Sequence, residues 1–304
     1  MVENRRRFWN FSGQMAGCTR VKRCLREPSM DQSHDPPLPP LVGHYDANYG
    51  NFQTDLYAQI RQEAFGEDIG QNSWLTASEQ DRFLGWLNLS PGKKLLDVAC
   101  GAGGPALRIA AKTGCSVVGI DVHEQAISTA KALTAERDLS LQAEFRLADG
   151  VGRLPFPDSC FDAITCIDAI NHLPNRREVV TEWSRVLKRD GKLLFTDPVI
   201  VTGPLTNAEI AVRSSIGFFL FVPPHYDESV IAECGLRLLV REDVTANLAE
   251  VAERRCVART SRGTTLRAIE GDGTYGGQQE FLAVASRVAR EGRLSRFVYV
   301  SEKI

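Results

Sequence analysis

The segment LLDVACGAGGPALRIA, residues 95–110, constrains the fold of this chain more than any other feature. An apolar run, which predicts a strand, leads through a glycine-rich turn into a pattern typical of a helix. Gly101 and Gly103 allow the backbone to turn tightly and to approach a ligand where a side chain would clash. The segment therefore predicts the first unit of a parallel sheet that binds a ligand at the carboxyl ends of its strands.

From Lys94 onwards, short apolar runs alternate with helical patterns, which predicts a sheet with helices on both faces. We expect seven strands, at residues 95–99, 116–120, 143–148, 161–167, 192–197, 236–244 and 296–300. We expect helices at 54–64, 78–87, 105–112, 124–137, 176–187 and 227–234, with further helical patterns within 207–221, 245–269 and 278–291. A break before the last of these is predicted by Gly271, Gly273, Gly276 and Gly277.

The chain divides into three predicted regions. Residues 1–42 are basic and then proline-rich, so we expect a disordered arm that the fold does not require. Residues 43–90 predict a helical lid, and 91–304 predict the ligand-binding domain. Insertions at about 203–225 and 245–293 would form a cap over the cleft at the carboxyl ends of the strands.

Composition excludes several classes of partner. The formal net charge is −2, so no overall field recruits nucleic acid or an anionic membrane. No apolar run reaches the roughly 18 residues that a membrane span needs. The eight cysteines are scattered, without a pair or histidine cluster at zinc spacing, which favours reduced thiols in a cytoplasmic protein and no metal site. We expect a small-molecule partner, and the oligomeric state stays open.

Acidic residues lie at the ends of the first three predicted strands. Asp97 lies just before the glycine-rich turn, and Asp121 follows Gly101 by 20 residues, where a carboxylate can accept two ribose hydroxyls. Asp149 is suited to the exocyclic amine of adenine. Together they favour S-adenosylmethionine, because Asp97 can hold the amino-acid end of that cofactor.

A nicotinamide dinucleotide is the competing ligand. Gly101, Gly103 and Ala106 also fit the G-x-G-x-x-G/A fingerprint of dinucleotide-binding folds, with Asp121 at the matching distance. Asp97 would, however, repel a diphosphate at the turn. The reductase-like Tyr299-x-x-x-Lys303 falls on the last predicted strand, where no helix aligns the two side chains.

Further motifs carry a resemblance to a known family. They are FGEDIG at 65–70, DVACGAGG at 97–104, GIDV at 119–122, CIDAINHLPNRREVVTEWSRVLKRDGKLLFTDP at 166–198 and RFVYVSEK at 296–303. With them, the chain from about Tyr45 resembles the class I S-adenosylmethionine-dependent methyltransferases of small molecules, including the phosphoethanolamine and the glycine, sarcosine and dimethylglycine enzymes. The resemblance implies an α/β, Rossmann-like seven-stranded sheet with an antiparallel last strand and a helical cap.

The resemblance also implies site residues. An aromatic residue before FGEDIG and two polar residues after it would close over the cofactor. The expected cofactor set is Tyr57, Gln71, Asn72, Asp97, Ala99, Gly101, Gly103, Asp121, Val122, Gln125, Asp149, Gly150 and Ile167. The catalytic set is His172, Tyr49 and Asp168. His172 would be the base, Tyr49 could hydrogen-bond it from the lid, and Asp168 could orient the imidazole or bind the substrate.

The acceptor is less defined. The tyrosines and lysine that read phosphate in phosphoethanolamine enzymes are not found, whereas the cap is rich in arginine: Arg213, Arg237, Arg241, Arg254, Arg255, Arg259, Arg262 and Arg267. One or two of these could face inward and bind a substrate carboxylate. Methylation of nitrogen, sulfur or oxygen stays open. A non-catalytic S-adenosylmethionine-binding regulatory module and a nicotinamide-dependent oxidoreductase are the alternatives.

Overall fold

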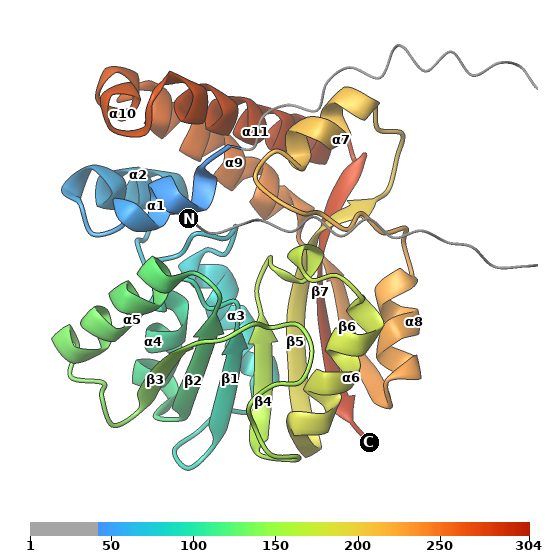
Figure 1. The fold of residues 1–304 in the computed structure, drawn as a ribbon. Helices are drawn as coiled ribbons and strands as arrows, with labels where there is room; N and C mark the ends of the chain where they lie inside the picture. The colour runs from blue at the N-terminus through green and yellow to red at the C-terminus, as the bar shows by residue number, and fades with distance from the viewer. Residues whose placement is uncertain (1–41) are drawn as a thin grey trace, which may run out of the picture. The chain divides into compact units, whose positions relative to one another are not determined.

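The computed structural model describes residues 42–304, so all but the last residue of the predicted arm lies outside it. The described chain is a central sheet between two layers of helices, with a helical cap above the sheet (Figure 1). Within the described residues, no helix has the length and apolar character needed to cross a bilayer.

The sheet contains seven strands in the order β3-β2-β1-β4-β5-β7-β6. β7 is antiparallel to both of its neighbours, whereas β1 to β5 pair in parallel. The strands are β1 Lys94–Val98, β2 Ser116–Asp121, β3 Ala143–Leu147, β4 Phe161–Cys166, β5 Leu187–Val201, β6 Leu236–Asp243 and β7 Leu294–Lys303. The predicted seven-stranded sheet with an antiparallel last strand is confirmed.

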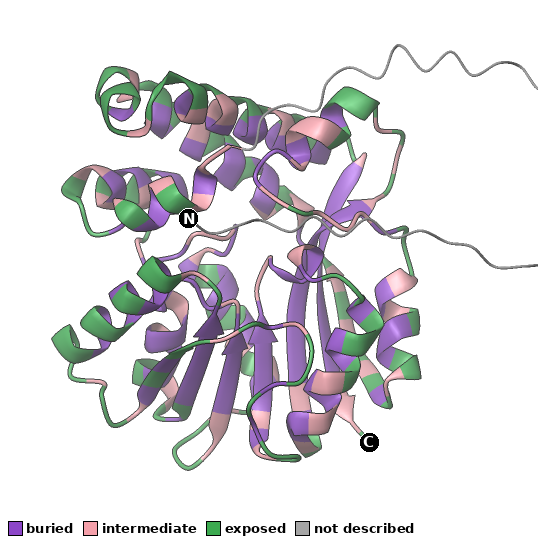
Figure 2. Cartoon of the chain, viewed as in Figure 1, coloured by how far each residue is buried: buried purple, intermediate pink, exposed green. Residues whose placement is uncertain are grey.

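The central strands are buried along most of their length (Figure 2). Their alternating side chains divide the core between the two faces of the sheet. Leu95 packs with α3 (Ala77–Leu87), α4 (Gly104–Thr113) and α5 (Glu124–Glu136). The next residue, Leu96, points to the other face and packs with α6 (Arg176–Val186) and α8 (Tyr226–Glu233). Because successive side chains point to opposite faces, a strand buried on both sides is apolar throughout.

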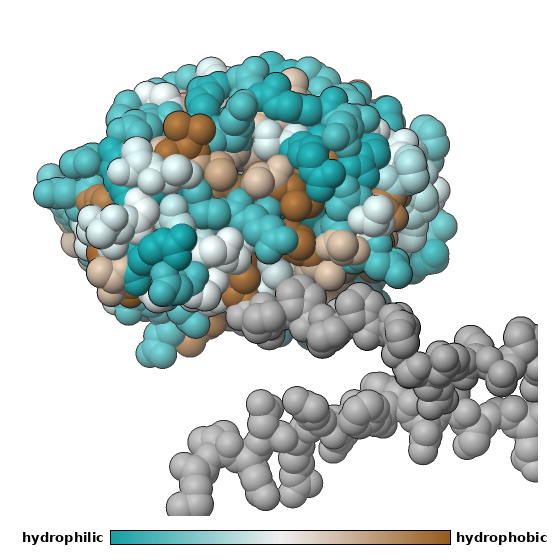
Figure 3. All heavy atoms as spheres, turned by 90° about the horizontal axis from the view of Figure 1, so that it is seen from above, coloured by the Kyte–Doolittle hydropathy of each residue, from teal (hydrophilic) through white to brown (hydrophobic). Residues whose placement is uncertain are grey.

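The cap has its own apolar core. It is built from α1 (His44–Gly50), α2 (Asp55–Phe65), α7 (Asn207–Arg213), α9 (Thr245–Thr260), α10 (Gly263–Glu270) and α11 (Asp272–Arg290). Trp74, Leu248 and Phe281 are buried in that core. Seen from above, the outer surface is mainly hydrophilic with scattered apolar patches (Figure 3). The cap is therefore held by burial of its inner face.

Threonines fix the starts of three helices. The hydroxyls of Thr54, Thr76 and Thr206 accept hydrogen bonds from the first turns of α2, α3 and α7. At α7, Glu209 bonds back to the Thr206 amide and completes a capping box. Each such cap stabilises its helix by about 1 kcal/mol.

The glycine-rich break is shorter than expected. α11 already begins at Asp272, so Gly273, Gly276 and Gly277 lie inside the helix and only Gly271 lies between α10 and α11. A Cβ on Gly277 would overlap the Val42 side chain, so this glycine leaves room for Val42 to pack on the helix. The helical pattern at 245–269 is also divided, into α9 and α10.

The helices of residues 43–90, predicted to form a lid, pack in two different places. α3 packs on the sheet through Phe83 and Leu87, so it belongs to the sheet layers, whereas α1 and α2 belong to the cap. The sequence pattern did not predict α1, because a helix of 7 residues shows too few turns for a clear period. The movement of this region as a lid stays a prediction.

Candidate active site

A cavity of about 590 Å³ lies between the carboxyl ends of β1, β2, β3 and β4 and the cap. Most of the predicted site residues line it: Tyr49, Asn72, Asp97, Ala99, Gly101, Asp121, Val122, Asp149, Gly150, Ile167, Asp168 and His172. Tyr45, Ser73, His123 and the segment from Ile216 to Phe218 also line it. The fold thus brings together groups that are up to 173 positions apart in the chain.

The glycine-rich turn runs along the floor of this cavity. Ala99 and Gly101 both have φ of 57°, in the left-handed region, which is strained for an alanine. A Cβ on Gly101 would lie 2.8 Å from the Tyr49 hydroxyl. Gly103 has φ of 77° and caps α4, but it does not line the cavity. Gly101 is therefore required by both the turn and the side chain above it.

Asp121 is held by the backbone. Its Oδ2 accepts a hydrogen bond from the Gly101 amide and its Oδ1 accepts one from the His123 amide, each at 2.9 Å. Burial raises the pKa of this carboxyl, and the two amides act in the opposite direction. The carboxylate keeps further lone pairs that can accept hydroxyl groups of a ligand.

Asp97 is the most perturbed carboxyl of the cavity. Burial raises its pKa to about 7, and a 2.7 Å hydrogen bond from the Thr165 hydroxyl partly offsets that effect. A cationic ligand group would restore the charged form. At the other side of the cavity, Asp149 is exposed, and its Oδ1 accepts a hydrogen bond of 2.9 Å from the Val151 amide.

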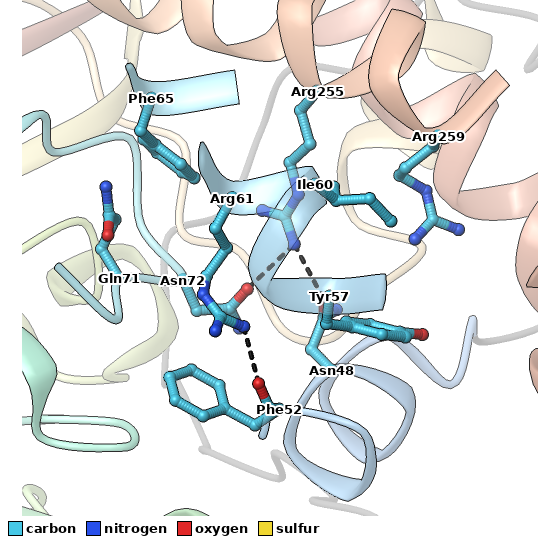
Figure 4. Close-up of a pocket in the computed structure, with 10 residues that line it drawn as sticks. All are labelled: Asn48, Phe52, Tyr57, Ile60, Arg61, Phe65, Gln71, Asn72, Arg255 and Arg259. Carbon is cyan, nitrogen blue, oxygen red and sulfur yellow. Dashed lines mark hydrogen bonds between the residues drawn. The ribbon is translucent and has the colours of Figure 1, made fainter. Parts of the chain in front are cut away.

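Tyrosines from α1 form the roof. The Tyr49 ring lies 4.8 Å from the His123 ring, above the turn. Tyr57, expected to cover the cofactor, does not line this cavity: its hydroxyl bonds Glu270 of α10, and its ring faces a separate, smaller cavity (Figure 4). Tyr49 and Tyr45 occupy the position over the cleft, because α1 rather than α2 lies above it.

His172, at the end of a short helical turn (Ile170–His172), has two defined partners. Its Nδ1 lies 2.8 Å from the carbonyl oxygen of Phe218, which can only accept, so Nδ1 carries the hydrogen. Its Nε2 lies 2.9 Å from the Tyr45 hydroxyl, which therefore donates to it. The expected partner, Tyr49, does not bond His172, because Tyr45 lies one helical turn closer to it.

Burial sets the proton affinity of this pair. It lowers the pKa of His172 to about 4, and the nearby positive charge of Arg213 acts in the same direction. Burial and the charge of Asp121 raise the pKa of Tyr45. At neutral pH the imidazole is thus uncharged and the tyrosine protonated, in agreement with the direction of the hydrogen bond between them.

Asp168 does not orient the imidazole. Its side chain is 2% exposed and bonds Arg296, with Nε 2.6 Å from Oδ1. It also accepts hydrogen bonds from the Thr196 hydroxyl at 2.8 Å and the Trp74 amide at 2.9 Å. Its lone pairs are thus engaged in holding β4, β7 and the loop before α3 together, although part of the residue lines the cavity.

Two further predicted residues lie outside the cavity. Gln71 is buried, and its amide bonds the backbone of Ile69 and Glu67, so it stabilises its own loop. Gln125 is exposed on the first turn of α5. Within residues 42–304, no group of three His, Cys, Asp or Glu side chains is arranged to hold a metal ion.

Sequence reasoning did not single out His123 or Ser73, which also line the cavity. His123 lies at the start of α5, and its ring meets that of Tyr49 through the packing of α1 on α5, which no local pattern encodes. The sequence also could not predict that Tyr45, rather than Tyr49, contacts His172.

Comparisons with known proteins identify the domain and the fold. Residues 96–195 match a family described as a methyltransferase domain. Over 203 residues, covering 63% of this chain and 74% of the relative, the chain is 29% identical to 27-O-demethylrifamycin SV methyltransferase of Amycolatopsis mediterranei (strain S699). The chain spans little more than half the length of several other curated methyltransferases that it matches.

Solved structures share the fold. The cyclopropane synthase MmaA2 of Mycobacterium tuberculosis superposes with a TM-score of 0.73 at 20% identity, covering 88% of this chain and all of that one. A putative sarcosine dimethylglycine methyltransferase of Galdieria sulphuraria superposes with a TM-score of 0.67 at 20% identity, covering 74% and 82%. With its strand order and its glycine-rich turn, the chain has the fold of the class I methyltransferases, and it contains a methyltransferase domain that uses S-adenosylmethionine.

Proposed function

We propose that the protein transfers a methyl group from S-adenosylmethionine to a nitrogen, sulfur or oxygen atom of a small, acid-bearing metabolite. The observation that carries this proposal is the hydrogen-bonded pair of Tyr45 and His172 at the wall of the cofactor cavity. A methyl acceptor that binds there faces a neutral imidazole behind a tyrosine hydroxyl. This arrangement suits the removal of one proton from the acceptor.

The residues of the cavity fit the cofactor. Asp121 would accept the ribose hydroxyls, Asp149 the adenine amine, and Asp97 the ammonium group of the amino-acid end. The three carboxylates disfavour a diphosphate, which argues against a nicotinamide dinucleotide. The cofactor supplies a methyl group that is already activated by a positive sulfur.

The protein's own part is alignment, exclusion of water and proton transfer. Tyr45 and Tyr49 cover the cavity from α1, and their rings present electron-rich faces to positive charge. The acceptor's proton would pass to the Tyr45 oxygen as the Tyr45 proton passes to Nε2 of His172. Nδ1 of His172 continues to donate its hydrogen bond to the Phe218 carbonyl oxygen. The resulting imidazolium is therefore hydrogen-bonded at both nitrogens.

Arg213 supports an acid-bearing acceptor. It is 1% exposed, and its Nε and Nη1 have no hydrogen-bond partner within the described chain. Its guanidinium lies 4.4 Å from the Phe281 ring centroid and 5.6 Å from that of Phe219, and the Phe219 ring also packs against His172. Arg213 does not line the cavity, so it would attract the acid through its charge.

A screen of small amines, thiols and carboxylic acids for release of S-adenosylhomocysteine tests the proposal. The best acid is then compared with its methyl ester. Arg213→Met should lower kcat/KM for the acid several-fold, because the through-space attraction between the two charges is lost. It should leave the ester nearly unchanged, and Arg254→Met, which removes an exposed arginine of α9, should change neither.

The same screen decides between an enzyme and a binding module. S-adenosylhomocysteine that binds in calorimetry without any turnover across the panel would favour a regulatory module. An equal loss for the acid and the ester in Arg213→Met would remove the argument for an acidic acceptor, while leaving methyl transfer itself in place.

A further inference from the structure

Arg255, on α9, is a buried cation without a carboxylate partner among residues 42–304. Its side chain is 6% exposed, and its Nη2 donates hydrogen bonds to Oδ1 of Asn48 at 2.8 Å and to Oδ1 of Asn72 at 3.0 Å. Both partners are neutral amides. Removing a guanidinium from water costs free energy unless a charge of opposite sign lies nearby, and the two neutral amides do not provide one.

The surroundings do not supply that charge. Three arginines, Arg61, Arg255 and Arg259, line a small cavity beside α9 (Figure 4). Two of them have carboxylate partners. Arg61 pairs with Asp68 at 2.9 Å, and Arg259 pairs with Glu270 at 2.7 Å. Glu270 also acts on Arg255 through space, but it pairs with Arg259, so Arg255 is left without a carboxylate partner of its own. Burial, followed by the charge of Arg259, lowers its pKa to about 10, so it stays protonated at neutral pH.

Asn72 connects this charge to the cofactor cavity. It lines both the small cavity and the large one. Because Arg255 occupies its Oδ1, the orientation of the amide is fixed, and its Nδ2 is buried without a hydrogen-bond partner in the described chain. A fixed, unsatisfied donor beside a buried positive charge is suited to a ligand anion.

The anionic part of the cofactor is its amino-acid carboxylate. Asp97 would hold the ammonium group of the same end, and its carboxylate would repel a second negative group close by. We propose that Arg255 is a positioning residue for the cofactor: it orients the Asn72 amide toward that carboxylate and provides the positive charge that attracts it. This inference rests on S-adenosylmethionine as the cofactor.

A purely structural role must be separated from this one. Arg255 also bonds Asn48 of α1, the helix that carries Tyr45 and Tyr49, so its loss could loosen the roof of the cavity. A loosened roof would weaken the binding of every ligand of the cavity to the same extent. Loss of an interaction with the cofactor carboxylate would weaken the binding only of ligands that have a carboxylate.

The experiment is calorimetry with two probes, S-adenosylhomocysteine and its decarboxylated analogue, which keeps the amine and lacks the carboxylate. Arg255→Gln should raise the Kd of S-adenosylhomocysteine about tenfold or more. It should change the Kd of the decarboxylated analogue by less than about twofold. Arg255→Lys, which keeps the charge, should recover part of the preference. Arg254→Gln, at the exposed neighbouring arginine paired with Glu250, is the matched control and should behave as the wild type.

A second variant covers the case in which Arg255→Gln does not fold. Asn72→Asp places a carboxylate beside Arg255, which neutralises the charge within the protein and removes the amide donor. It should fold, bind the decarboxylated analogue and lose the preference for S-adenosylhomocysteine. If these variants bind both probes equally more weakly, or bind both as the wild type does, the proposal is overturned. A wild type that binds neither probe would instead overturn the cofactor assignment.

Discussion

Asp168 and Arg296 form a buried ion pair that joins the end of β4 to β7. Nε of Arg296 lies 2.6 Å from one carboxylate oxygen of Asp168, and Nη1 of Arg296 lies 2.8 Å from both carboxylate oxygens of Glu79 on α3. Asp168 adopts a φ of 55°, which is unusual for a residue other than glycine. A strained backbone and a saturated carboxylate indicate a residue that maintains the edge of the cavity.

Asp168→Ala is therefore expected to act on stability. It leaves Arg296 buried with Glu79 as its remaining carboxylate partner, and breaking a buried pair in this way costs about 3–5 kcal/mol. Denaturant unfolding measures the change. Asp158→Ala, which removes an exposed partner of Arg185, should leave the free energy of unfolding nearly unchanged. An Asp168→Ala protein of normal stability that lacks turnover would instead make this a catalytic group.

His172→Ala should lower the single-turnover rate roughly 10²–10⁴-fold, the usual contribution of a general base. Tyr45→Phe should lower it as well, and the two losses should not add in the double variant, because the residues act as one unit. Tyr49→Phe is the control, since Tyr49 covers the cavity without bonding His172. Additive losses, or near-normal turnover of His172→Ala across pH 6–9, would contradict the proton relay.

Cofactor affinity should depend on pH through Asp97. Its pKa in the unliganded protein is raised to about 7 by burial, and binding of an ammonium group requires the ionised form. Below that pH the carboxyl must first lose a proton, so affinity falls as the pH falls. The Kd of S-adenosylhomocysteine should rise about tenfold from pH 8 to pH 6. Asp97→Asn should bind weakly at both pH values, and calorimetry that finds the wild-type Kd independent of pH would exclude this role.

Hydrogen exchange should locate the lid. Residues 43–75 carry Tyr45, Tyr49 and Asn72, so their amides should exchange more slowly once S-adenosylhomocysteine is bound. The amides of α3 should change little, because that helix packs on the sheet away from the cavity. If the amides of residues 43–75 exchange at the same rate with and without bound cofactor, the roof of the cavity does not become more ordered on binding. That result would contradict the lid.

Much of the sheet could be predicted because its signals are local. The apolar runs and the glycine-rich turn identify strands and their carboxyl ends, and parallel strands place residues such as Asp97 and Asp121 at one edge whatever the rest of the chain does. The same reasoning placed His172 correctly at that edge. The roles of those residues stay predictions.

The tyrosines show where such reasoning stops. Tyr45, Tyr49 and Tyr57 are equivalent in the sequence, and only the packing of α1 above the turn and of α2 against α9 decides which ring faces the cleft. The orientation of the imidazole by Asp168 fails for a similar reason, since its partner Arg296 lies 128 positions away, whereas a contact of Asp168 with the substrate stays a prediction. Gly277 counted toward a predicted break, because the close approach of Val42 to this helical glycine is invisible in the sequence.

The placement of β7 between β5 and β6 sets an order for folding. β6 has no sheet neighbour except β7, so it cannot join the sheet until residues 294–303 have been inserted. Arg296 arrives with that strand, and until then Asp168 and Glu79 face each other without their counter-charge. The first five strands can pair along the chain as it emerges. The edge of the cavity that Asp168 and Arg296 hold is thus completed last, through contacts of long sequence separation that are slow to form.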